Sequence, residues 1–186
     1  MVPGCAAALV LAAPARAQRA FVGVGAGLGY IHDSGTEESG VRPSIRALAG
    51  YRVASGVSIV LEGTAHGLSE DARDFLSEPE GETGVLAVQT LLLAARFDLG
   101  DDAYLRPGVG LGRHAFAVGT PASTGGFTFD VSHEAGLAAG LTAGYAVRMG
   151  DNFSLNLEGV VAWSGGEDSS GSRVVGGVLV VPTWRF

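Results

Sequence analysis

The final stretch of the chain, Arg173–Phe186 (RVVGGVLVVPTWRF), constrains the fold more than any other segment. In an extended strand, successive side chains point to opposite faces. One face of this segment then carries only apolar residues and glycine as far as Phe186, where fraying and solvation are normally expected. A strand whose outer face meets lipid explains this pattern, so we predict a small transmembrane β-barrel with this segment as its closing strand. The apolar face comprises Val174, Gly176, Val178, Val180, Pro182, Trp184 and Phe186.

The composition agrees with membrane-spanning strands and not with spanning helices. Hydrophobic residues make up 47% of the 186-residue chain, yet no run approaches the roughly 18–20 apolar residues that a spanning helix needs. The 30 glycines often alternate with larger residues, which argues against helices and against a dense soluble core. The net charge of −7 argues against nucleic acid as a partner.

The first residues have the pattern of an export signal. Met1–Ala17 contains a short apolar region, Cys5–Ala13, followed by an A-x-A cleavage signal at Ala15–Ala17. We therefore expect residues 1–17 to be a signal peptide and residues 18–186 to form a single barrel domain.

Eight segments of alternating polarity follow the leader, each close to the roughly 9–11 residues of a tilted spanning strand. The fourth is the least regular, because its apolar run Leu91–Ala95 blurs the two faces. There we expect Phe97 to face outward and Arg96 inward. The predicted strands are Arg19–Ile31, Arg42–Val53, Val57–Leu68, Thr83–Leu99, Tyr104–Phe116, Val131–Arg148, Phe153–Ser164 and Arg173–Phe186.

The connections alternate between short turns and longer loops, as in bacterial outer-membrane barrels. The sequence therefore predicts an all-β fold: an eight-stranded antiparallel up-and-down transmembrane β-barrel with short periplasmic turns and longer extracellular loops. The expected turns are Ala54–Gly56, Gly100–Ala103 and Met149–Asn152, and the expected loops are His32–Val41, Ser69–Glu82, Ala117–Asp130 and Gly165–Ser172.

Outward aromatic residues provide an independent check, because they should gather at the two membrane interfaces. Tyr30 and Trp163 fall at the loop end of their strands. The turn end of the strands receives Tyr51, Phe97, Tyr145, Phe153, Trp184 and Phe186.

Several charged residues face the interior by the same alternation. An eight-stranded barrel encloses a space that side chains can just fill, and buried charges are tolerated there only when they are paired. Arg46 and Glu62 are the best pair, and Glu158 is expected to pair with Arg106 or Arg96 across the lumen. We interpret these residues as a structural network that plugs the barrel, and the alternative is a narrow gated channel for ions or small solutes. The predicted lumen network is Arg46, Glu62, Arg96, Arg106 and Glu158.

Two histidines, His66 and His114, face inward near the loop end on non-adjacent strands. Imidazole is a common metal ligand, but two without a third form a weak site. We therefore predict no metal and no cofactor.

The sequence Ser132-His133-Glu134 superficially suggests catalysis. On a strand, however, His133 points away from both of its neighbours. We predict no enzymatic activity, with an outer-leaflet lipid-modifying enzyme as a lesser alternative. A soluble lipocalin-like ligand carrier is a rival from another class, and it would have an apolar lumen and a polar exterior.

The second long loop is strongly acidic. Such loops usually remain solvated by mutual repulsion. They could also bridge divalent cations to lipopolysaccharide phosphates or present an adhesive surface, and these alternatives stay open. Its acidic residues are Glu70, Asp71, Asp74, Glu78, Glu80 and Glu82, with Arg73 as the opposing charge.

Three segments of the sequence carry a resemblance to a known family. They are Phe21–Tyr30 (FVGVGAGLGY), Tyr104–Gly112 (YLRPGVGLG) and Val180–Phe186 (VVPTWRF). With them the chain resembles the small eight-stranded outer-membrane β-barrels, the OmpA/OmpX-like or outer membrane protein beta-barrel domain group. The resemblance implies a monomer in the bacterial outer membrane, surrounded by outer-membrane lipid and lipopolysaccharide. It also implies insertion by the barrel-assembly machinery, with Trp184 and Phe186 as the assembly signal. A structural or surface-interaction role follows from this resemblance.

Overall fold

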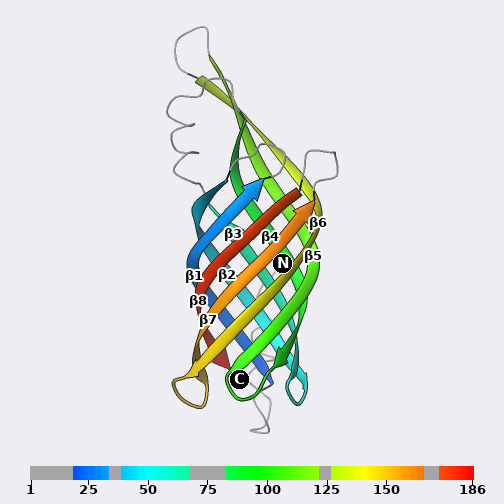
Figure 1. Cartoon of the computed structure of the whole chain (residues 1–186), viewed down its shortest axis with the longest axis vertical. Coiled ribbons are helices and arrows are strands. Elements are labelled where there is room, and N and C mark those ends of the chain that lie inside the picture. The colour runs from blue at the N-terminus through cyan, green and yellow to red at the C-terminus, as the bar shows by residue number, and fades with distance from the viewer. Residues whose placement is uncertain (1–18, 34–38, 68–82, 122–126, 166–171) are drawn as a thin grey trace, which may run out of the picture.

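The computed structural model describes residues 19–33, 39–67, 83–121, 127–165 and 172–186, and these form a closed barrel in which each strand pairs antiparallel with its neighbours (Figure 1). This confirms the predicted eight-stranded up-and-down barrel. No helix in the described part of the chain is long and apolar enough to cross a membrane. The strands are β1 (Ala20–Asp33), β2 (Ser39–Ala54), β3 (Val57–His66), β4 (Thr83–Asp98), β5 (Ala103–Pro121), β6 (Phe127–Arg148), β7 (Phe153–Gly165) and β8 (Ser172–Arg185).

The barrel is closed by pairing between the first and last strands. The register of β1 and β8 runs from Phe21 opposite Arg185 to Asp33 opposite Arg173. At the end of this seam, the Phe186 amide donates a hydrogen bond of 2.8 Å to the Ala20 carbonyl. The closing role predicted for the last segment is therefore confirmed.

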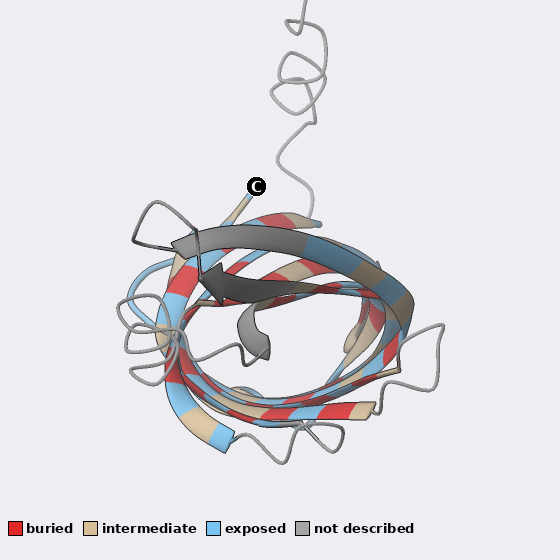
Figure 2. Cartoon of the chain, turned by 90° about the horizontal axis from the view of Figure 1, so that it is seen from above, coloured by how far each residue is buried: buried red, intermediate tan, exposed pale blue. Residues whose placement is uncertain are grey.

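Side chains alternate between the two sides of the barrel wall, as Figure 2 shows by the striped burial of each strand. On the outside, Val24 is 64% exposed, whereas the inward Glu158 is 0% exposed. Apolar residues dominate the outward positions, and polar residues occupy many inward ones. This is the opposite of the lipocalin-like arrangement, and a wall of this kind suits a lipid surrounding.

The three short turns mark one end of the barrel, called here the turn end, and the opposite end is called the loop end. Each turn contains a glycine in the left-handed region: Gly56 (φ 71°), Gly100 (φ 94°) and Gly150 (φ 150°). A side chain at these φ values would be strained, so glycine fixes where each hairpin reverses. All three glycines fall in the turns predicted from sequence.

The loop end differs from the prediction mainly because strands extend into two of the expected loops. In His32–Val41, β1 runs to Asp33 and β2 begins at Ser39. In Ala117–Asp130, β5 runs to Pro121 and β6 begins at Phe127, so the two strands form a hairpin stem that ends with Pro121 opposite Phe127. Val, Thr and Phe favour strands, and paired backbone groups satisfy one another whether or not a membrane surrounds them. Figure 1 shows this stem rising above the other strands. The leader, residues 1–17, and the whole of the predicted loop at Ser69–Glu82 lie outside the described residues.

The two aromatic belts lie where alternation places them. Tyr51, Tyr145 and Trp184 are exposed at the turn end, and Tyr30 and Trp163 are exposed at the loop end. The rings of Phe153 and Trp184 also contact each other across β7 and β8, with centroids 5.2 Å apart. Amphipathic aromatic rings at both ends match the two interfaces of a bilayer.

The seam between β1 and β8 leaves no space for a side chain at Gly27. A methyl group at Gly27 would collide with the Val178 carbonyl oxygen, whereas one at Gly176, on the same seam, would come no closer than 3.9 Å to the Val160 carbonyl oxygen. We expect Gly27→Ala to lower the free energy of unfolding by about 1–3 kcal/mol, the usual cost of overpacking. The matched control Gly176→Ala should retain the stability of the parent. Heat-modifiable migration on gels, followed against urea concentration, measures this, and equal stability of the two variants would contradict the tight seam.

Candidate functional site

Four charged side chains from four strands meet inside the barrel. Arg46 lies on β2, Glu62 on β3, Arg106 on β5 and Glu158 on β7, and all four are buried. Each occupies an inward position of its strand, so all four side chains point into the lumen. Two arginines and two glutamates make this set, called here the charged layer, formally neutral.

Glu158 is the most firmly held member of the charged layer. Its carboxylate accepts two parallel hydrogen bonds from Arg106, from Nη1 to Oε1 at 3.0 Å and from Nη2 to Oε2 at 2.9 Å. Arg46 Nη1 donates to Oε2 at 2.8 Å, and the Tyr104 hydroxyl donates to Oε1 at 2.5 Å. A bidentate arginine is the strongest geometry for holding a carboxylate. Glu158 is therefore the centre of the layer.

Glu62 is held less completely. Its Oε2 lies 2.6 Å from Arg106 Nε and 3.7 Å from Arg46 Nη1. Neither Glu62 Oε2 nor Arg106 Nε makes an aligned hydrogen bond, although both atoms are buried. Glu62 therefore contributes charge balance with less directional bonding than Glu158.

Neutral hydroxyls complete the coordination of Arg46. Its Nε donates to Thr64 Oγ1 at 2.9 Å, and its Nη1 donates to Thr142 Oγ1 at 3.1 Å. Burial of an ion pair is tolerated when the remaining protons also find acceptors. The predicted lumen network did not include Thr64, Thr142 or Tyr104, and only the inward parity of these polar residues could have indicated them.

Arg96 stands apart from the charged layer. Its Nε donates to Asp98 Oδ1 at 2.8 Å, and its guanidinium lies 3.7 Å from the centre of the Tyr104 ring. The Tyr104 ring itself packs against Gly144, which faces it directly across β5 and β6. Of the two partners expected for Glu158, Arg106 forms the ion pair. Arg96 instead makes a cation–π contact with Tyr104 nearer the turn end.

Apolar clusters lie in the same lumen. Ile31, Val88 and Val175 form one buried cluster on the loop side of the charged layer. A second cluster includes Phe21 near the turn end, and its remaining members are Leu48, Val60, Ala94, Val160, Leu179 and Val181. Side chains thus occupy the lumen at several heights, as expected for a barrel of this strand number.

The two inward histidines have separate protein partners. His66 Nδ1 lies 2.6 Å from Ser44 Oγ, and His114 Nε2 lies 2.7 Å from Ser164 Oγ. His114 Nδ1 also contacts the Arg173 guanidinium. Because arginine can only donate, Nδ1 must accept and Nε2 carries the proton. Val88 stands between the two histidines in the register, and no cluster of three potential metal ligands occurs among the described residues.

The Ser132-His133-Glu134 sequence does not converge on one site. Strand β6 places His133 on the opposite face from its two neighbours. Glu134 Oε2 lies 3.9 Å from Arg173 Nη1, which ties it to an inward cation. Trp184 and Phe186, assigned by resemblance to assembly recognition, are 44% and 52% exposed at the turn end.

The closed barrel, its apolar outer wall and its charged interior define an outer-membrane β-barrel protein of bacteria. The chain belongs to the outer membrane protein beta-barrel domain family, whose model matches residues 4–159. No curated protein matches the chain.

Solved structures show the same fold. Neisserial surface protein A is similar, with 16% sequence identity and a TM-score of 0.61 over 90% of this chain and 97% of that one. Ail, the attachment invasion locus protein of Yersinia pestis, has 11% identity and a TM-score of 0.63 over 92% of this chain and 100% of that one. Ail in complex with the heparin analogue sucrose octasulfate has 12% identity and a TM-score of 0.60 over 90% and 98% of the two chains. At these identities the likeness concerns the fold alone.

The unequal bonding of the two glutamates predicts unequal stability losses. Glu158→Gln leaves two buried arginines without their main counter-charge, and we expect it to lower the free energy of unfolding by about 3–5 kcal/mol. Glu62→Gln should cost clearly less, because Glu62 Oε2 accepts no aligned hydrogen bond. Urea unfolding in lipid vesicles, followed by the fluorescence of Trp163 and Trp184, compares the two variants. A larger loss for Glu62→Gln would contradict this ranking.

Proposed function

We propose that this protein is a non-conducting, non-catalytic outer-membrane barrel that acts as a membrane-embedded support for surface interactions. The observation that carries this proposal is the clamp on Glu158, which Arg46 from β2 and Arg106 and Tyr104 from β5 hold in place. A path for ions through the lumen would have to separate these groups. Breaking a buried ion pair costs several kcal/mol, so the paired state is strongly favoured.

The apolar side chains in the lumen support the same proposal. Ile31, Val88 and Val175 are almost completely buried on the loop side of the charged layer. These side chains occupy part of the lumen that an ion would need to cross. The charged layer and the apolar cluster therefore oppose conduction for different physical reasons.

With the lumen filled, contact with the cell exterior falls to the loop end. Ail, which shares this fold, has been solved with a heparin analogue, a polyanion. In this chain the segment 69–82 carries six acidic residues and one arginine, which favours a cationic partner or divalent cations over a polyanion. We therefore propose a surface role in which this chain binds cationic partners rather than polyanions.

A narrow gated channel is the second candidate, and one observation favours it. Glu62 Oε2 and Arg106 Nε are buried, 2.6 Å apart, and yet are not aligned as a hydrogen bond. The Glu62–Arg106 contact is therefore the part of the charged layer that would separate first if the lumen opened.

Conductance decides between these two candidates. In planar bilayers, the refolded parent and Glu62→Ala should both lack discrete current steps, because the Glu158 clamp persists in the variant. Single-channel steps in the parent that change in size or frequency in Glu62→Ala would establish the gated channel and overturn the closed-barrel proposal. Heat-modifiable migration of both proteins confirms that each sample is folded.

The surface role has its own test. At low ionic strength we expect the refolded protein to pass through heparin resin and to bind polylysine-coated surfaces. A variant in which the acidic residues of 69–82 are changed to their amides should lose polylysine binding, because the attraction is electrostatic. Retention of the parent on heparin, or equal polylysine binding by the variant, would contradict the proposed charge preference.

A further inference from the structure

The outer wall carries one isolated charge. Among the strand side chains that the structure describes, Arg113 on β5 is the only formally charged one on the outward face. It is exposed, and the described residues provide it with no hydrogen bond or ion pair. A charged side chain on a lipid-facing wall is strongly destabilising at the bilayer midplane and nearly neutral near the interfaces. The height of Arg113 therefore decides what it can contact.

Arg113 lies at the outer edge of the apolar band. Along β5 the outward positions below it are Leu105, Pro107, Val109 and Leu111, and Arg113 follows them directly. It stands ten residues from the start of β5 at Ala103, which is roughly 25 Å along the axis for a strand tilted about 40°. The apolar band of such barrels is also about 25 Å tall. Arg113 thus lies at the level of the outer-leaflet headgroups.

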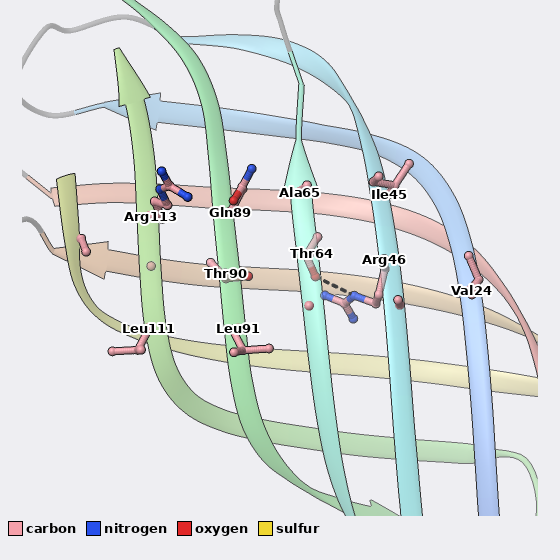
Figure 3. Close-up of a pocket in the computed structure, with 14 residues that line it drawn as sticks. Val24, Ile45, Arg46, Thr64, Ala65, Gln89, Thr90, Leu91, Leu111 and Arg113 are labelled. Carbon is pink, nitrogen blue, oxygen red and sulfur yellow. Dashed lines mark hydrogen bonds between the residues drawn. The ribbon is translucent and has the colours of Figure 1, made fainter. Parts of the chain in front are cut away.

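A hollow of about 540 Å³ lies in the outer wall beside Arg113 (Figure 3). Most of its lining residues occupy outward positions. The small residues Ala47, Gly63 and Ala65 leave a depression in the outer surface there. Larger side chains border it, namely Val24, Ile45, Leu91 and Leu111.

The register orders this hollow into two rows. Gly63, Leu91 and Leu111 lie side by side across β3, β4 and β5. One step toward the loop end, Ala65, Gln89 and Arg113 form the next row. Polar groups therefore stand on the headgroup side of an apolar depression, and Gln89 adds amide donors beside the guanidinium.

We propose that this depression is a binding site for one outer-leaflet lipid with a phosphate headgroup, that is, lipopolysaccharide. Arg113 binds the phosphate through its planar guanidinium, which matches phosphate oxygens bidentately. An acyl chain lies over Ala47, Gly63 and Ala65, where the absence of larger side chains makes room for it. The order of the site, cation above apolar depression, is the order of the lipid itself, phosphate above acyl chain.

The charge pattern of the barrel supports this occupant. The outward face around Arg113 offers no acidic side chain among the described residues, so an anion approaches without repulsion. The site opens on the outer side of the barrel wall, and the inward residues Arg46 and Thr64 also contribute to its lining.

Native mass spectrometry of the full refolded chain in detergent micelles tests the site, with lipid A as the probe. We expect one bound lipid A, with affinity lowered about tenfold or more by Arg113→Gln, which removes the phosphate partner. Ala65→Leu, which fills the depression, should lower the affinity as well. Two controls should bind like the parent: Arg52→Gln, at the turn end, and Val178→Leu, on strand β8.

Each further outcome has a defined meaning. Dephosphorylated lipid A should bind more weakly to the parent, and inorganic phosphate should not displace lipid A, because both the headgroup and the chain contribute. Unchanged binding by Arg113→Gln, or equal losses in the two controls, would overturn the proposal. Displacement by inorganic phosphate alone would also overturn it, since the depression would then play no part. Heat-modifiable migration verifies that every variant is folded.

Discussion

The pairing of β1 with β8 is the interaction on which the rest of the structure depends. In hydrocarbon every backbone N–H and C=O must find a partner, and an open sheet would leave the edges of β1 and β8 unpaired. The seam closes because Gly27 lets the two backbones approach without a side chain between them. Once the ring is closed, each strand has a lipid side and a lumen side, and every residue is assigned to one of them.

This assignment explains why charge gathers inside the barrel. A narrow lumen of low polarity makes an unpaired arginine or glutamate very costly, so the inward charges must satisfy each other. Arg46 and Arg106 do so by sharing Glu158, and Tyr104 supplies a further donor from below. The same layer that removes this cost also places side chains across the lumen, so in the proposed closed barrel stability and closure have one physical origin.

Strand alternation made much of this structure predictable, because its period of two is set by backbone geometry alone. The inward positions of Arg46 and Glu158, and the outward positions of Val178 and Trp184, follow from that period. Partner choice across the lumen does not follow from it. The Arg46–Glu158 pair joins β2 to β7, and its formation depends on strand tilt and stagger, which single-strand patterns do not contain.

On the outer wall, unlike in the lumen, charged side chains cannot pair with one another, and Arg113 is the example. Ions inside the lumen can neutralise one another, whereas an arginine facing lipid has only lipid or water for a partner. At the interface that partner can be a phosphate, and the small residues beside Arg113 leave room for the chain attached to it. In the proposed closed barrel, the specific chemistry therefore belongs to the outside, where Arg113 is the single unpaired cation among the described outward strand side chains and the sequence of residues 69–82 is acidic.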